Sequence, residues 1–151
     1  MILISHRGNI SGRNPDLENN PFYIMNAVRS NFDVEVDVWL VDGKFFLGHD
    51  SPEHEVEWRF LKNSYLWCHA KNKEALSAML TLGIHCFWHQ NDDYTLTSKG
   101  YVWTYPGKET AKQSIIVCNE FNKDLIGACT GICSDNISSY LDEMKNRGIA
   151  W

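Results

Sequence analysis

Two carboxylates, Glu35 and Asp37, lie two positions apart in the run VEVDVWL of this 151-residue chain. Alternate residues of a strand share a face, so both carboxylates point the same way and the valines between them point the other way. Neighbouring carboxylates repel, and one of them gains a proton unless a positive charge lies between them. The pair therefore predicts a cation at this place, and carboxylate oxygens are ligands that Mg²⁺ and Ca²⁺ prefer.

Residues suited to proton transfer and to phosphate binding occur around this pair. His6 follows the run ILIS, and His49 follows KFFLG. An imidazole has an ordinary pKa of about 6.5, so each histidine can give or take a proton near neutrality. Arg7 offers a planar guanidinium for phosphate oxygens, and Lys71 offers a point charge. With a divalent cation, this set points to cleavage of a phosphodiester, one histidine deprotonating the nucleophile and the other protonating the leaving oxygen.

Apolar runs alternate with helical patterns along the chain. We expect strands over 2–5, 33–40, 64–70, 84–90, 114–119 and 131–135, hairpins around Asp42-Gly43 and Lys99-Gly100, helices over 21–30, 54–63, 71–83 and 137–148, and a helical turn over 123–129. This order predicts one α/β domain over 1–151 with a largely parallel sheet, whose ligand site forms at the carboxyl ends of the strands. Several polar residues fall at or near such ends: His6, Glu35, Asp37, His69, His89 and Asp135.

Charge, cysteine usage and hydropathy exclude several classes of protein. The net charge is −5 and no Lys/Arg-rich run is present, which argues against nucleic-acid binding. The five cysteines form no C-x-x-C pair, and we interpret them as buried reduced thiols, with a zinc site on Cys129, Cys133 and a distant histidine as the alternative. The N-terminus lacks the pattern of a signal peptide, and no window approaches the ~20 apolar residues of a membrane span. The sequence therefore predicts a soluble, cytoplasmic protein.

Several blocks of the chain resemble the signature motifs of the glycerophosphodiester phosphodiesterase family, in the family order and with similar spacing. They are ISHRGN, ENNPFYIMNAV, FDVEVDVWLVDGKFFLGHD and the late block GICSDN, dense over the first 50 residues and sparse after them. The resemblance implies a TIM (β/α) barrel of the PLC-like phosphodiesterase type, reduced or distorted because a full barrel usually needs ~250 residues. It also implies that His6 and His49 are the acid–base pair, that Arg7 binds the phosphate, and that Glu35 and Asp37 hold one divalent ion.

The third expected strand departs from the family pattern, which has a carboxylate two residues before a lysine. Lys71 matches that lysine and is expected on the phosphate, but the carboxylate is replaced by His69. As a third metal ligand, an imidazole shifts the preference from Mg²⁺ or Ca²⁺ toward Mn²⁺ or Zn²⁺. The segment 87–108 has no counterpart in the family pattern, and its His89 and Trp103 are further candidates for substrate contacts.

The expected function is metal-dependent hydrolysis of a small glycerol- or polyol-phosphodiester. In the family that this chain resembles, a hydroxyl of the substrate usually attacks first, and water then opens the cyclic phosphate. Two alternatives remain open: a phospholipase-D-like lyase that releases the cyclic phosphate, and a phosphate-binding module without turnover, which the short chain and His69 favour. Glu18 and Asn19 are expected to brace the loop or cap the following helix. An exposed edge of a short barrel would favour a homodimer.

Overall fold

The computed structural model describes residues 1–118 and 120–150. The strands are β1 (Ile2–His6), β2 (Asp33–Val41), β3 (Lys44–Leu47), β4 (His54–Val56), β5 (Leu66–Ala70), β6 (Cys86–Trp88), β7 (Tyr94–Leu96), β8 (Val102–Thr104), β9 (Ser114–Val117) and β10 (Gly131–Ser134). The helices are α1 (Pro21–Arg29), α2 (Trp58–Leu61), α3 (Lys73–Thr81) and α4 (Ile137–Asn146), with one short 3₁₀ helix, η1 (Lys123–Leu125). Asn119, the last residue of the strand predicted over 114–119, lies outside the described residues.

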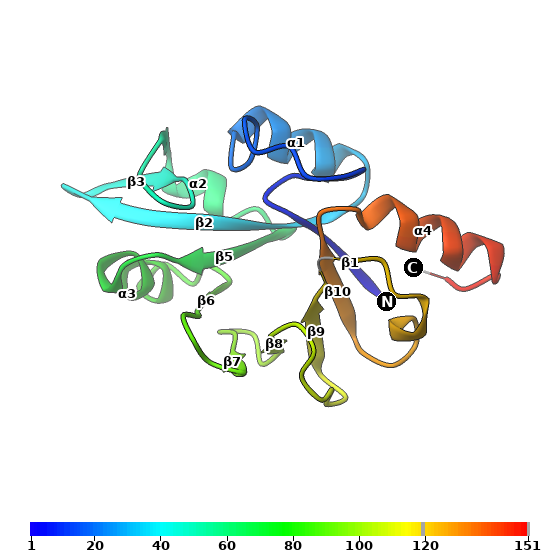
Figure 1. Cartoon of the computed structure of the whole chain (residues 1–151). Coiled ribbons are helices and arrows are strands. Elements are labelled where there is room, and N and C mark those ends of the chain that lie inside the picture. The colour runs from blue at the N-terminus through cyan, green and yellow to red at the C-terminus, as the bar shows by residue number, and fades with distance from the viewer. Residues whose placement is uncertain (119, 151) are drawn as a thin grey trace.

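The strands form one curled, mixed sheet. A parallel series runs in the order β6, β5, β2, β1, β10, β9, β8, while β3 and β4 extend β2 in antiparallel fashion and β7 pairs antiparallel with β8. Within the described residues, β6 pairs only with β5 and β7 only with β8, so strand pairing does not close the sheet. Figure 1 shows the resulting half-barrel, with α1 and α4 on its outer side.

The predicted TIM barrel is wrong, although the predicted parallel pairing is present. A (β/α)₈ barrel follows each strand with a helix, whereas the described part of this chain has four α-helices for ten strands. Hairpins and short loops replace the missing helices because 151 residues cannot supply eight strand–helix units. The helix predicted over 54–63 is also wrong in its first half, where β4 pairs with β3 and aligns Val56 with Phe45.

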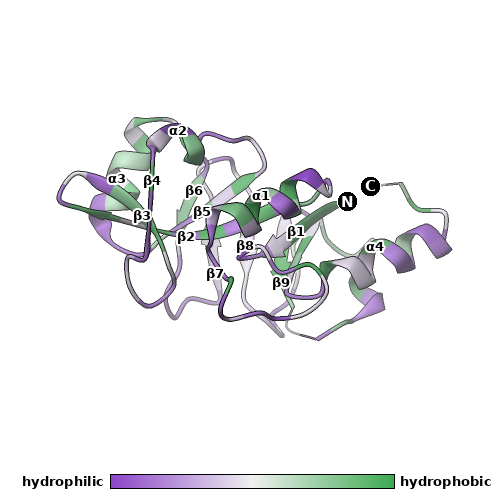
Figure 2. Ribbon diagram, turned by 90° about the horizontal axis from the view of Figure 1, so that it is seen from above, coloured by the Kyte–Doolittle hydropathy of each residue, from purple (hydrophilic) through white to green (hydrophobic). Residues whose placement is uncertain are grey.

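The alternation of side chains along β2 separates two apolar layers. Val34, Val36 and Val38 face outward and pack in one buried cluster with Ile24 of α1 and Met79 of α3. A second outer cluster joins β1 and β10 to α4. The opposite, inner face of the curled sheet is filled by another buried set: Ile4, Trp67, Phe87, Trp103, Ile115 and Cys133. Figure 2 shows green, apolar stretches in strands such as β1 and β2 and on helices such as α1 and α2, whereas many connecting loops are purple and hydrophilic.

Asparagine side chains fix the starts of two helices that pack on β2. Asn20 accepts hydrogen bonds from the backbone amides of Phe22 and Tyr23, and Pro21 occupies the first helical position as predicted. Asn72 caps α3 through the amide of Ala75. The same Asn72 side chain also bonds the backbone N–H and C=O of Leu40, so the helix start is tied directly to β2.

All five cysteines are free thiols, but only Cys68, Cys86 and Cys133 are buried as predicted, whereas Cys118 and Cys129 are partly exposed. Burial raises the pKa of Cys68 and Cys133 well above the ordinary thiol value, so both remain protonated. Among the described residues, no helix has both the length and the apolar composition needed to cross a bilayer.

Candidate active site

A cavity of about 410 Å³ opens at the carboxyl ends of the parallel strands. Its lining includes residues that the sequence singled out: His6, Arg7, Glu35, His49, His69, Lys71, His89 and Trp103. Asp37, the remaining predicted metal ligand, is fully buried and contacts Arg7 and His69. The structure therefore brings every predicted site residue together at one place, although these residues come from segments far apart in the sequence.

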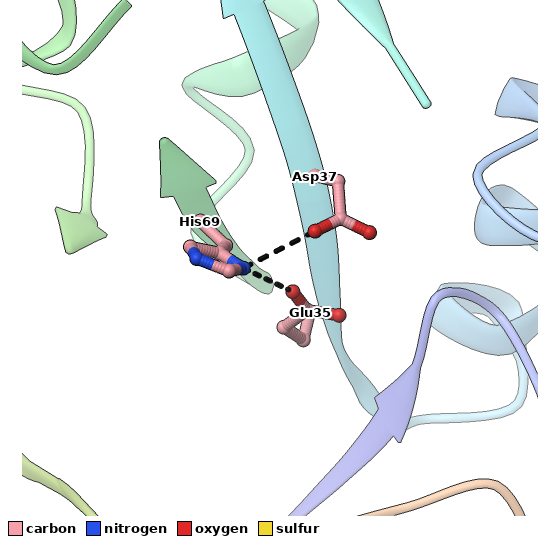
Figure 3. A group of neighbouring side chains, drawn as sticks. All are labelled: Glu35, Asp37 and His69. Atoms are coloured by element: carbon pink, nitrogen blue, oxygen red, sulfur yellow. Dashed lines mark ion pairs between the residues drawn. The ribbon is translucent and has the colours of Figure 1, made fainter. Parts of the chain in front are cut away.

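The acidic pair and His69 form a compact cluster. In the parallel pairing of β2 and β5, Asp37 aligns with His69, so the imidazole faces the same interior as the two carboxylates. Its Nδ1 lies 3.1 Å from Oδ1 of Asp37 and 3.6 Å from Oε1 of Glu35, as Figure 3 shows. One ligand atom from each of the three residues lies within 4.8 Å of the others. Among the described residues this is the one such group of three or more, so the alternative zinc site on Cys129 and Cys133 is not formed.

The donor atoms of this cluster suit a divalent cation. Oε2 of Glu35 and Oδ1 of Asp37 are buried, and neither receives a hydrogen bond of good geometry from another described residue. Nε2 of His69 lies 2.9 Å from the backbone oxygen of His89, and donation to this oxygen leaves the Nδ1 lone pair of the neutral ring facing the carboxylates. Metal-bound histidines are commonly held in this way. Two carboxylates and one imidazole nitrogen thus form a set that can hold a metal ion.

Cationic side chains also stabilise the acidic pair. Arg7 Nε lies 2.9 Å from Oδ2 of Asp37, and Lys71 Nζ lies 3.5 Å from Oδ1. Burial raises the pKa of Asp37, but the close contact with the His69 imidazole and the charges of Arg7, His69 and Lys71 outweigh it and hold this pKa well below its ordinary range. Burial lowers the pKa of His69, but its hydrogen bonds to Asp37 and Glu35 raise it overall to about 9. The positive charge predicted between the carboxylates can therefore come from the His69 imidazolium or from a metal ion.

His6 is oriented by a carboxylate from the far end of the chain. Its Nδ1 lies 2.8 Å from Oδ1 of Asp135, which follows β10, and its Nε2 lies 3.8 Å from Oε2 of Glu35. Burial lowers the pKa of His6, but the hydrogen bond to Asp135 and the charge of Glu35 raise it overall above the ordinary imidazole value. Burial raises the pKa of Asp135, but the bond with His6 lowers it overall, so Asp135 stays ionised. Donation from Nδ1 to Asp135 leaves Nε2 as the nitrogen available for proton transfer.

The loop after β1 holds Arg7 through a network of hydrogen bonds. Arg7 has a positive φ of 55°, and its Nη1 donates to Oε2 of Glu18 at 3.1 Å. The buried Asn9 side chain donates both to Oε1 of Glu18 at 3.1 Å and to Oδ1 of Asp135 at 2.8 Å. One amide therefore joins the carboxylate that holds Arg7 to the carboxylate that holds His6. Gly8 lies between Arg7 and Asn9 in the chain and has a φ of 95°, and a Cβ at this position would collide with the ring of Tyr23.

Glu18 and Asn19 brace the site, as the sequence indicated. Asn19 donates to Oδ2 of Asp37 at 2.9 Å and accepts from the backbone N–H of Asp37 at 2.9 Å. These two hydrogen bonds fix the Asp37 carboxylate relative to the loop. The helix cap itself is Asn20, one residue later, so Asn19 is a bracing residue only.

His49 reaches the cavity from the loop between β3 and β4. Its side chain is 43% exposed, and its Nδ1 lies 2.7 Å from Oδ1 of Asp50. The preceding Gly48 has a φ of 151°, and a Cβ at this position would collide with the carbonyl oxygen of Ser51. Trp39 donates from its indole N–H to the Gly48 carbonyl at 2.7 Å. A glycine is thus required for the turn that brings His49 to the cavity.

The remaining wall of the cavity is largely aromatic. Trp103 is only 3% exposed and stacks on Phe87 with ring centroids 4.4 Å apart, so most of its surface belongs to the inner core. His89 lies against Tyr105 at 5.5 Å, and burial together with the charge of His69 lowers the pKa of His89. Tyr105 was missed by sequence reasoning, although it lies two residues after Trp103 and so shares its face.

Sequence reasoning also missed the role of Asn9 and the partner of Asp135. Asn9 ends the HRGN run and could have been noticed there, because a buried loop amide needs hydrogen-bond partners. Its hydrogen bond to Asp135, 126 positions away, cannot be predicted from the local sequence.

Comparison with protein-family models, with curated proteins and with solved structures finds no match to this chain. Inference about function therefore rests on the motifs and on the geometry of the site.

Proposed function

We propose that this protein is a metal-dependent phosphodiesterase of the glycerophosphodiester type. The observation that supports the proposal most is the presence of both His6 and His49 on one cavity with Arg7 and Lys71. Two imidazoles and two cationic side chains are what acid–base cleavage of a phosphodiester needs. The volume of about 410 Å³ is in the range of sites for small molecules.

The balance of charge favours a divalent ion. The carboxylates around the site are Glu18, Glu35, Asp37 and Asp135, and the side chains that are always cationic there are Arg7, Arg13 and Lys71. With neutral histidines these groups are slightly negative in sum, and protonation of His69, whose pKa is raised to about 9, brings the sum close to zero. A divalent ion held by Glu35, Asp37 and His69 reverses the sign and would neutralise charge on the phosphoryl oxygens.

The two histidines differ in a way that suggests their roles. His6 is paired with Asp135, so its Nε2 takes the proton of the attacking hydroxyl, and Asp135 stabilises the imidazolium that results. Arg7 and Lys71 hold the phosphate oxygens. His49, exposed at the mouth of the cavity, protonates the leaving alcohol oxygen and regains its proton from solvent. When water opens a cyclic phosphate, the roles are exchanged: His49 takes a proton from the water, and His6 returns its proton to the hydroxyl oxygen of the substrate.

The test is turnover of glycerophosphocholine and bis(p-nitrophenyl) phosphate with Mg²⁺, Ca²⁺, Mn²⁺ or Zn²⁺. We expect metal-dependent release of a phosphomonoester, and a loss of roughly 10²- to 10⁴-fold in kcat for His6→Asn and for His49→Asn. His54→Asn is the matched control, because His54 lies on β4 and does not line the cavity. Equal activity of the two site variants and the control would overturn the proposal.

A binding module without turnover is the second candidate. It is favoured by His69, because the imidazolium can replace a metal ion between the carboxylates at 3.1 and 3.6 Å. Tight binding of a phosphodiester with no turnover under any of the four metals would select this candidate. Phosphorus NMR of the products separates the remaining alternative, since a cyclic phosphate that persists identifies a lyase.

A further inference from the structure

A second hollow lies on the other side of His6 and Arg7. It measures about 540 Å³ and is lined by six residues: His6, Arg7, Gly12, Arg13, Asp135 and Asn136. Because His6 and Arg7 also line the cavity described above, these two side chains stand between the two hollows. The two hollows therefore adjoin at His6 and Arg7.

The two hollows differ in chemical character. Beyond the shared residues, the first cavity has a wall that includes Trp103, Tyr105 and Val117. The second has no aromatic residue in its lining and offers the side chains of Arg13 and Asn136. The two ester arms of a diester that spans both hollows would therefore meet different surroundings. The first cavity places aromatic side chains beside polar ones, whereas the second has only polar side chains, among them the carboxylate of Asp135 and the guanidinium of Arg13.

Arg13 is held in place but keeps donors available. Its Nε donates to Oε1 of Glu18 at 3.0 Å, the carboxyl group whose other oxygen accepts from Arg7. The Arg13 side chain is 63% exposed, and within the described residues it has no ion-pair partner other than Glu18. Asn136 accepts from the Ser138 hydroxyl through Oδ1, so its amide N–H₂ remains available as well. A fixed guanidinium with free terminal N–H groups is suited to carboxylate or phosphate oxygens.

We propose that the substrate is a diester whose phosphate lies between His6 and Arg7, with one arm on the aromatic wall and the other in the second hollow. The arm in the second hollow carries an anionic group, a carboxylate or a phosphomonoester, which Arg13 binds. This assignment rests on the proposed phosphodiesterase function and makes Arg13 its specificity-determining residue.

The experiment uses three p-nitrophenyl phosphodiesters with the same leaving group. Their second arms are glycerol, glycerate and glycerol bearing a terminal phosphate, so each keeps a hydroxyl next to the ester. We measure kcat/KM for each diester with the wild-type protein, Arg13→Gln, Arg13→Lys and the control Arg29→Gln. Arg29 lies at the end of α1 and lines neither hollow.

The readout is the ratio of kcat/KM for a charged arm to that for the neutral glycerol arm. We expect the ratio to fall about tenfold in Arg13→Gln, less in Arg13→Lys, and to stay unchanged in Arg29→Gln, since exposed charge-assisted contacts are of modest strength. The glycerate and phosphate arms show which anion is preferred. An unchanged ratio in Arg13→Gln overturns the assignment of Arg13.

Failure of the proposed function has a different signature. If the wild-type protein turns over none of the diesters, that function is wrong, and the same diesters then serve as ligands in isothermal titration calorimetry. A charged-to-neutral ratio of dissociation constants that does not depend on Arg13 overturns the inference in that case as well.

Discussion

Two histidines one strand apart show how the two ends of the curled sheet differ. His69 lies near the carboxyl end of β5, where Glu35 and Asp37 raise its pKa to about 9. His85 lies just before the start of β6, where its ring centroid is 4.3 Å from that of Trp67 and its Nε2 is 3.1 Å from the Thr97 hydroxyl. Burial and the charge of Lys99 lower the pKa of His85 to about 4.

Burial alone does not set the protonation state of these two rings. Removal from water lowers the pKa of both histidines, and only the carboxylates at the carboxyl end reverse that effect for His69. Charged groups are concentrated at that end, while the interior around His85 is filled by aromatic rings such as Trp67 and Tyr101. We therefore expect the carboxyl end to carry the chemistry and the aromatic interior to carry the stability.

The largest effect on stability is expected for Phe87→Ala. Phe87 is 2% exposed and stacks on Trp103 at 4.4 Å and on His69 at 5.1 Å, so the substitution leaves a cavity between packed rings. The free energy of unfolding, measured by urea titration, should fall by about 3–5 kcal/mol. Phe22→Ala is the control, because Phe22 is 82% exposed and its loss should change the same quantity by less than about 0.5 kcal/mol. Equal losses for the two variants would contradict the assignment of stability to this interior.

A smaller effect is expected on metal affinity at the other end. Glu35→Gln removes a charged oxygen ligand from the cluster with Asp37 and His69, so the dissociation constant for Mn²⁺ in calorimetry should rise at least about hundredfold. Asp33→Asn is a matched control from the same face of β2, where Asp33 accepts a hydrogen bond from the Trp67 indole at 2.8 Å. If both substitutions weaken Mn²⁺ binding equally, the metal does not lie at the carboxyl end.

The smallest effect concerns pH and His85. Its folded pKa of about 4 lies below the unfolded value near 6.5, so the unfolded chain binds more protons between these values. The stability contributed by the neutral ring is complete above pH 6.5 and is lost as the pH falls toward 4. From pH 7 to pH 5 the loss from this group is about 2 kcal/mol.

His85→Gln isolates this contribution, because it removes the titrating ring and keeps a polar group near Thr97. The difference in unfolding free energy between the wild-type protein and His85→Gln should shrink as the pH falls from 7 to 5. A difference that stays constant over this range would show that His85 is not held neutral.

Much of the local structure follows from short stretches of sequence. The alternation of β2 places Glu35 and Asp37 on one face, Asp42-Gly43 marks the hairpin, and Pro21 marks the start of α1, all as predicted. The expected strand ends also predict which polar residues meet, since carboxyl ends of parallel strands lie at one edge of a sheet. The barrel prediction failed because a family-like series of motifs says little about how many helices a short chain can place between its strands.

By itself, the sequence determined the residues of the acidic pair, the shared face on which they lie and the histidines able to transfer protons, because these depend on side-chain chemistry and on the two-residue period of a strand. Long-range packing is what makes Asp135 orient His6, lets Asn9 join Asp135 to Glu18, and leaves the curled sheet open within the described residues. Such contacts depend on how segments more than a hundred residues apart pack together, and local patterns carry no record of that packing. The opposite proton affinities of His69 and His85 arise in the same way, from neighbours supplied by other strands and loops.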